Sequence, residues 1–343
     1  MMVRLALCAA AAALAAPAVA QVPAKPLFAS TAPLALTIDA PFGGLLRNRG
    51  SEKQVDGILT DERGNRLPIR VGLRGLTRRT GDICAFAPLM VRFAVPPPAT
   101  STFAGQKKLK LVTHCRQAAD GDRFTLLEYA GYRLYAALTP KSFGARLATI
   151  SYREPNGRTV ATRPAFFIED LDDVAARNGV AEIRTKARVP LADISPTDGA
   201  LYGLFQHMIA NHDWSMRAGP AGDNCCHNAK LIGSLATGAA VPIPYDFDFS
   251  GFVSAPYATP PEQLNLSSVR QRKYRGFCAH NPAVVAAARA IRDKQPALLA
   301  EIAAIPGLDR GAAAQAHAFL QPFFAEIATD ASLQANILGR CVG

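Results

Sequence analysis

Short apolar runs separated by turn-forming residues dominate the chain from 55 to 113. Asp61–Asn65 ("DERGN") divides the first two runs, and "LMVRFAV" (89–95) and "KLKLV" (108–112) form two more. Runs of this length bounded by turn residues are typical of β-strands. A hairpin is predicted farther on, where "PNG" (155–157) separates two strand-like segments.

Helical spacing marks two longer segments. Apolar residues fall on one face of 122–138, which Pro140 ends, and on a wide face of 197–210. Alanine-rich helical segments dominate from Pro282 onward. The chain therefore divides into a strand-rich half with one helix and a mostly helical half. This division predicts an α+β organisation with two lobes.

The first 20 residues have the pattern of a secretory signal peptide. Arg4 precedes a short apolar run, and Ala18-Val19-Ala20 forms a small-residue cleavage site. We expect cleavage after Ala20 and a periplasmic or secreted protein. No later stretch is apolar for long enough to predict a transmembrane segment. We further expect an irregular leader over 21–54, an N-terminal β-rich lobe over 55–175 and a C-terminal helical lobe over 176–343.

Removal of Cys8 with the signal leaves an even number of cysteines, which favours disulfides in an exported chain. The six are Cys84, Cys115, Cys225, Cys226, Cys278 and Cys341. Cys84 and Cys115 lie on adjacent strand-like runs of the first half, so we predict that they pair with each other. The other four would then tie the second half together.

The net charge of +11 favours an anionic partner. Much of the basic excess lies in the first half of the chain. Nucleic acid is not expected, because no basic motif is interleaved with aromatic residues and the chain carries an export signal. Phosphate groups are a narrower candidate.

The segment "PIPYDFDFSGF" (242–252) sets two carboxylates, Asp246 and Asp248, among aromatic residues. Its alternation predicts a strand with one apolar and one acidic face, ended by Gly251. An acidic face of this kind is either solvated or holds a hard cation such as Mg²⁺, which prefers oxygen ligands.

The order of the polar residues around this segment favours the second interpretation. Asp213 lies in a loop after the helix of 197–210, Asn228 ends that loop, and Asp246 follows a predicted hairpin. Phosphoryl transfer of the kinase type uses one Asp to orient or deprotonate the accepting hydroxyl. It uses an Asn and a second Asp to hold the Mg²⁺ that bridges the nucleotide phosphates. Taken singly, each of these residues is ordinary in a turn or on a solvated face.

With these motifs in place, the sequence resembles the CotH-type (spore coat protein H) kinase-like family, over roughly 55–253. The segments that resemble it are "VGLRGLTRR" (71–79), "LLEYAGYRLY" (126–135), "FFIEDLDD" (166–173), "NHDWS" (211–215), "HNAKL" (227–231) and "PYDFDFSG" (244–251). The resemblance implies a two-lobed protein-kinase-like fold with a small antiparallel β lobe and a larger helical lobe. It also implies an exported kinase that uses ATP and Mg²⁺ (or Mn²⁺) to phosphorylate a protein or small-molecule hydroxyl.

The resemblance also assigns roles to single residues. Asp213 matches the catalytic base. Asn228 and Asp246 match the metal ligands, and Asp248 lies where a further polar ligand is expected. The positions assigned to nucleotide binding are Arg74, Arg78, Lys110 and Glu128, the last two as a Lys–Glu ion pair.

Two departures from the family leave alternatives open. No lysine follows the Arg-Gly segment in "CAFAPLMVRF" (84–93), and Asp213 and Asn228 are 15 residues apart, a longer spacing than in common protein kinases. One alternative is a catalytically inactive binding or structural protein of the cell envelope. The other is a metal-dependent hydrolase that uses Asp213, Asp246 and His227.

Overall fold

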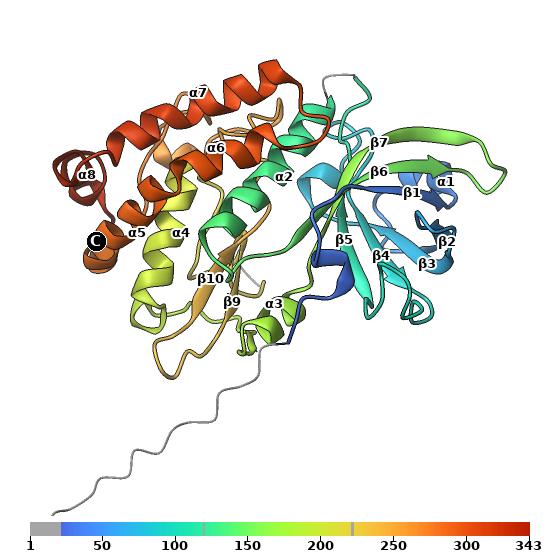
Figure 1. The fold of residues 1–343 in the computed structure, drawn as a ribbon, viewed down its shortest axis with the longest axis horizontal. Helices are drawn as coiled ribbons and strands as arrows, with labels where there is room; N and C mark the ends of the chain where they lie inside the picture. The colour runs from blue at the N-terminus through green and yellow to red at the C-terminus, as the bar shows by residue number, and fades with distance from the viewer. Residues whose placement is uncertain (1–21, 119–120, 221–222) are drawn as a thin grey trace, which may run out of the picture.

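A computed structural model describes residues 22–118, 121–220 and 223–343. The expected signal peptide, 1–20, lies outside these residues. Figure 1 shows the strands of the first half gathered on one side and the helices of the second half on the other, with α2 (Gly121–Leu138) running between them.

Seven strands of the first half close into a barrel in the order β1-β2-β3-β4-β5-β7-β6. They are β1 (Leu34–Asp39), β2 (Val55–Thr60), β3 (Arg66–Leu73), β4 (Leu89–Phe93), β5 (Lys108–Val112), β6 (Ala145–Arg153) and β7 (Thr159–Ile168). Neighbouring strands are antiparallel except β1 and β6, which run parallel, with Leu36 opposite Ile150. Because this last pair joins the two ends of the sheet, the barrel has no open edge.

Alternation along the strands fills the inside of the barrel. In β3 the side chains of Leu67, Ile69 and Val71 are buried in the barrel core, and the residues between them are exposed. The predicted strands of this half and the hairpin at 155–157, which joins β6 and β7, are therefore confirmed. The segment 21–54, expected to be irregular, contributes β1 and the short helix α1 (Phe42–Arg47).

The expected two-lobed kinase-like fold with a small β lobe is wrong. The described residues form a closed seven-stranded mixed barrel together with eight helices. The physical reason is the pairing of β1 with β6, which closes a sheet that the sequence pattern left open. The division into lobes at residue 175 stays a prediction.

The second core packs α2 against the helices that follow. These are α3 (Leu171–Arg177), α4 (Pro196–Met208), α5 (Asn281–Asp293), α6 (Gln295–Ala303), α7 (Arg310–Glu326) and α8 (Asp330–Asn336). The helices predicted over 122–138 and 197–210 correspond to α2 and α4. A small sheet of β8 (Glu182–Ile183), β9 (Ala229–Ile232) and β10 (Val241–Pro244), in the order β10-β9-β8, lies beside α4.

The strand predicted over 242–252 is much shorter in the structure. The strand β10 ends at Pro244, and Asp246 has a φ of 64°, in the left-handed region. That conformation cannot continue a strand, although Asp tolerates it better than most residues. The chain therefore turns at Asp246 and does not present a flat acidic face.

Three disulfides join the described cysteines. Cys84 pairs with Cys115, as predicted, and the four cysteines of the second half pair as Cys225–Cys226 and Cys278–Cys341. Disulfides are typical of proteins that fold in an oxidising compartment. None of the helices in the described part of the chain is both long and apolar enough to cross a membrane.

Candidate functional site

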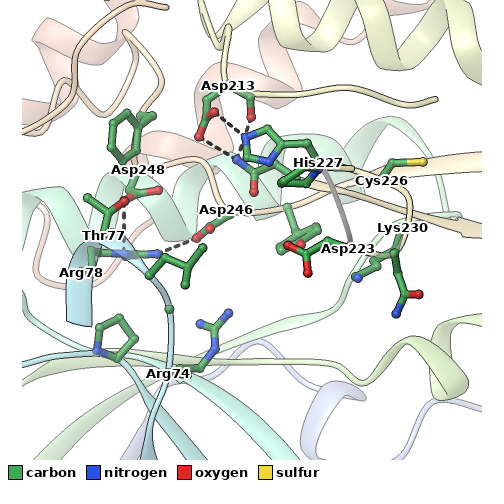
Figure 2. Close-up of a pocket in the computed structure, with 18 residues that line it drawn as sticks. Arg74, Thr77, Arg78, Asp213, Asp223, Cys226, His227, Lys230, Asp246 and Asp248 are labelled. Atoms are coloured by element: carbon green, nitrogen blue, oxygen red, sulfur yellow. Dashed lines mark hydrogen bonds and ion pairs between the residues drawn. The ribbon is translucent and has the colours of Figure 1, made fainter. Parts of the chain in front are cut away.

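Most of the polar residues predicted from the sequence to form the site line one pocket of about 400 Å³. One side is the turn that follows β3, with Arg74 and Arg78, and the other sides are the loops that flank β9 and β10. Figure 2 shows Asp213 and Arg74 on opposite sides of this pocket with Asp246 between them. The sequence-predicted residues that line it are Arg74, Arg78, Asp213, Asn228, Asp246 and Asp248.

The loop after α4 holds Asp213 in place through its neighbours. The backbone N–H of Asp213 donates to Oδ1 of Asn211 (3.1 Å), and Nε1 of Trp214 donates to the carbonyl of Asn211 (2.9 Å). Asn211 and Trp214 are both buried, so their packing holds this turn in place. The carboxylate of Asp213 is about one-third exposed and reaches the pocket.

Two neighbouring residues bind that carboxylate. Nε2 of His227 lies 2.5 Å from Oδ1 of Asp213, and Nδ2 of Asn228 donates to Oδ2 of Asp213 at 2.9 Å and to its carbonyl at 2.7 Å (Figure 2). Because Nδ2 of Asn228 donates to Asp213, Oδ1 of the same Asn228 amide points away from Asp213 and remains available as an acceptor. A carbonyl oxygen of this kind is a suitable ligand for a hard cation.

Pairing between β9 and β10 brings Asp246 close to Asn228. Pro244 lies opposite Ala229 in the sheet, and the N–H of Tyr245 donates to the carbonyl of Asn228 at 3.2 Å. The turn at Asp246 is supported by the hydroxyl of Tyr132, which accepts from the backbone N–H of Asp246 at 3.0 Å. The carboxylate of Asp246 is one-third exposed and lines the pocket.

The guanidinium of Arg78 binds three carboxylates at once. It contacts Oε2 of Glu128 at 2.7 Å, Oδ1 of Asp246 at 2.6 Å and Oδ2 of Asp248 at 3.2 Å. Arg78 and Glu128 are almost fully buried, so water does not solvate their charges and the two charges stabilise each other. The hydroxyl of Tyr257 donates a further hydrogen bond to Asp248 at 3.1 Å.

The predicted Lys110–Glu128 ion pair is wrong, because Glu128 binds Arg78. Nζ of Lys110 lies instead 4.9 Å from the ring centre of Tyr245. Lys110 lines an adjoining cavity of about 170 Å³, and Lys230 borders both this cavity and the main pocket. Glu128 contacts Arg78 and lines neither of the two cavities.

Burial and nearby charges give the two aspartates different acidities. Burial alone would raise the pKa of Asp246, but the positive charges of Arg78, Arg74 and Lys110 lower it. Burial raises the pKa of Asp248 to about 8, in spite of Arg78. Burial, together with repulsion from Arg74, lowers the pKa of Lys110 to about 7. Of these two aspartates, Asp246 is the one that stays ionised at neutral pH.

The donor set fits a divalent cation at the pocket side of Asp246. Asp246 offers an ionised, partly exposed carboxylate and Asn228 offers an amide oxygen, which are hard oxygen ligands. Carboxylate oxygens of Glu128, Asp246 and Asp248 also lie within 4.8 Å of one another, but Arg78 occupies the space among them. A cation would therefore bind toward Asn228 and not within this group of three.

The sequence pattern assigns no role to Lys230, and it assigns His227 no role in the kinase-like arrangement. His227 directly precedes Asn228, so its proximity to Asp213 follows once Asn228 is placed. Lys230 lies two positions beyond Asn228 on β9, and its exposure to the pocket depends on the pairing of that strand. The sequence contains no separate signal for it.

We expect the Asp213–His227 pair to make stability pH-dependent. The hydrogen bond to Asp213 raises the pKa of His227 above its ordinary value of 6.5, against the effect of burial. The stabilisation is therefore complete below pH 6.5 and is lost as the pH rises through the raised pKa. Urea unfolding of wild type at a series of pH values should show this loss, and His227→Gln should remove it.

The control is His317→Gln, which removes a histidine that binds the carbonyl of Leu299 away from the pocket. This variant should keep the wild-type pH dependence. An unchanged dependence in His227→Gln would show that the pair does not couple to folding.

No protein-family model and no curated protein matches the chain.

Proposed function

We propose that the protein is an exported phosphotransferase of the CotH type, which uses ATP and Mg²⁺ (or Mn²⁺) to phosphorylate a hydroxyl of a protein or small molecule. One observation carries the proposal: Asp213, Asn228 and Asp246 line one pocket opposite Arg74, held there by hydrogen bonds. The chemistry of these side chains supports it independently of the kinase-like fold, which the barrel excludes.

Asp213 is suited to receive the hydroxyl of the acceptor. Its carboxylate is partly exposed, and His227 and Asn228 fix its direction. A carboxylate so oriented can align an incoming hydroxyl and take its proton as the new bond to phosphorus forms. His227 stabilises the negative charge of Asp213 between turnovers.

Asp246 and Asn228 are suited to hold the cation. Bound Mg²⁺ would neutralise the phosphate oxygens and keep the transferred group in line. Asp246 supplies the negative charge, and Arg78 keeps that carboxylate ionised and fixed in direction.

Basic side chains around the pocket suit the phosphates of a nucleotide. Arg74 and Lys230 line the pocket, and Figure 2 shows Arg74 directed into it. Guanidinium groups bind phosphate oxygens well, because their N–H groups match the spacing of the oxygens. Most residues that line the adjoining cavity are charged, but Met90, Ile168 and Leu171 give it an apolar part that suits a nucleobase.

Export is the remaining part of the proposal. The pattern of residues 1–20 predicts a cleaved signal, and the three disulfides support a periplasmic or secreted location. The alternative is an inactive binding protein of the envelope, and the contacts of Arg78 favour it. A cation must share Asp246 with this guanidinium, which already binds Oδ1 at 2.6 Å.

A transfer assay separates the two functions. The purified protein is incubated with γ-phosphate-labelled ATP, Mg²⁺ and a set of hydroxyl-bearing proteins and small molecules. We expect labelled acceptor from wild type and at least about a hundredfold less from Asp246→Asn, because a required metal ligand is lost.

Asp56→Asn is the matched control, since Asp56 is exposed on β2 away from the pocket and should leave transfer unchanged. Absence of transfer, with no nucleotide-dependent protection against melting, would reject the phosphotransferase and favour the inactive binding or structural protein. Release of labelled phosphate without an acceptor, equally from ATP and simple phosphoesters, would favour a hydrolase.

A further inference from the structure

A groove of about 490 Å³ lies beside α7, apart from the pocket described above. It is lined by Arg270, Arg272, Gln315, Ala318, Phe319 and Pro322. The four residues of α7 share one face of the helix, and the arginines belong to the irregular segment that runs along it. Arg270 also borders a small adjoining cavity, which Arg123 of α2 lines as well.

The arginines of the groove stack on a single ring. The guanidinium carbons of Arg270 and Arg272 lie 4.7 Å and 4.3 Å from the ring centre of Phe319. Stacking of this kind fixes the planar groups. Among the residues that the structure describes, Nε and Nη2 of Arg270 and Nη1 of Arg272 make no hydrogen bond and can bind an anion. Arg272 is anchored further, because it donates to the carbonyls of Met208 and Phe319 at 3.1 and 2.5 Å.

The charge of the groove is not balanced by its surroundings. Within the described residues, no acidic side chain lines the groove or the small cavity beside it, and neither stacked arginine forms an ion pair. The negative charge of Glu326 acts on Arg272, but its carboxylate also binds Nε2 of His207 at 2.7 Å. Burial lowers the pKa of Arg272 only to about 10, so it remains positive at neutral pH.

Gln315 adds an uncharged polar group to the groove. Its side chain can both donate and accept a hydrogen bond. Ala318 and Pro322 line the groove beside it. Two guanidinium groups and an amide together suit a polypeptide with acidic side chains, because the guanidinium groups bind carboxylates and the amide oxygen accepts from a backbone N–H.

The groove is connected to the loop that carries Asp213. Nη1 of Arg270 donates to the carbonyl of Gly251 at 3.4 Å, and Gly251 closely follows Asp248 along the chain. Nε2 of His212, the residue before Asp213, lies 2.8 Å from the carbonyl of Gln271. A ligand held by the arginines therefore lies against the same segment that supports the pocket.

From these observations we propose that the groove of Arg270, Arg272 and Phe319 binds an acidic segment of a polypeptide. Its role as the docking site of a protein acceptor rests on the proposed phosphotransferase function. The binding itself requires neither nucleotide nor cation.

The test is fluorescence anisotropy of a labelled peptide rich in Asp and Glu, titrated with the purified protein in the absence of nucleotide. The reference is the same peptide with Asn and Gln in place of the acidic residues. We expect wild type to prefer the acidic peptide. Arg270→Gln should weaken that binding about tenfold, as expected for the loss of one charge-assisted hydrogen bond.

Arg310→Gln is the matched control, because it removes the same charge from an exposed position on α7 outside the groove. Gln315→Glu is a second variant, which adds a negative charge inside the groove and should also weaken binding. Equal affinity for both peptides, equal losses in Arg270→Gln and Arg310→Gln, or tighter binding of polyphosphate or anionic vesicles than of the peptide would overturn the proposal.

This assay separates the two proposals. A protein that binds the acidic peptide but transfers no phosphate retains the docking site and loses the phosphotransferase function. If transfer occurs, Arg270→Gln should raise the KM for an acidic protein acceptor and leave kcat and the KM for ATP unchanged.

Discussion

Replacing Arg78 by Ala should lower the free energy of unfolding by about 3–5 kcal/mol. Arg78 is the shared partner of Glu128, Asp246 and Asp248, and it is 7% exposed. Without the guanidinium, the buried carboxyl groups have no positive partner in contact, and each must either take up a proton or stay charged without compensation, which burial makes costly. Urea denaturation of wild type and variant at neutral pH measures the difference.

One control and one further measurement accompany this result. Arg70→Ala removes an exposed arginine whose ion pair with Asp56 spans 3.8 Å, and it should change stability by less than about 0.5 kcal/mol. Added Mg²⁺ should also raise the free energy of unfolding more in Arg78→Ala than in wild type. The space vacated by the guanidinium leaves carboxylate oxygens within 4.8 Å of one another, which can bind the cation. A loss in Arg78→Ala no larger than in Arg70→Ala would contradict the role given to this residue.

Replacing Asp213 by Asn should lower kcat for phosphoryl transfer by about 10²–10⁴-fold, the usual contribution of a general base. The amide oxygen can still accept from Asn228, so the turn is preserved while the negative charge is lost. The KM for ATP should stay close to the wild-type value, because the proposed function places Asp213 at the acceptor and not at the phosphates. Steady-state transfer kinetics measure both constants.

Asp223→Asn is the control for this variant, since Asp223 lines the same pocket and has no proposed role. It should keep most of the transfer activity. Thermal unfolding of both variants shows whether any loss of activity reflects misfolding. A kcat for Asp213→Asn within a few fold of wild type would exclude Asp213 as the base.

The sequence predicted the composition of the pocket better than the fold around it. Asp213, Asn228 and Asp246 were placed together because their order along the chain matches a known chemical arrangement. Asn228 and Asp246 meet because β9 and β10 are adjacent in the chain and pair with each other, and Asp213 joins them through the bridge between Ser215 and His227. Local pairings of this kind are accessible to pattern-based reasoning, since few residues separate the partners.

Closure of the barrel was not predictable in the same way. It depends on parallel pairing of Leu34–Asp39 with residues more than a hundred positions later, and no short-range pattern records that contact. The partner of Glu128 was missed for a similar reason. "TRR" (77–79) has the composition of an exposed basic turn, yet the short helix Thr77–Arg79 directs Arg78 inward. Burial of a charged residue follows from tertiary structure and not from its neighbours in sequence.

The central claim is that Asp246 and Asn228 hold one divalent cation together with the phosphates of a nucleotide. Titration of Mn²⁺ followed by electron paramagnetic resonance, with and without ATP, tests it most directly. We expect one bound Mn²⁺ per chain in the presence of ATP, at a level above that bound by ATP alone, and its loss in Asp246→Asn. Equal binding by wild type and Asp246→Asn, or no binding beyond that of free ATP, would contradict the claim.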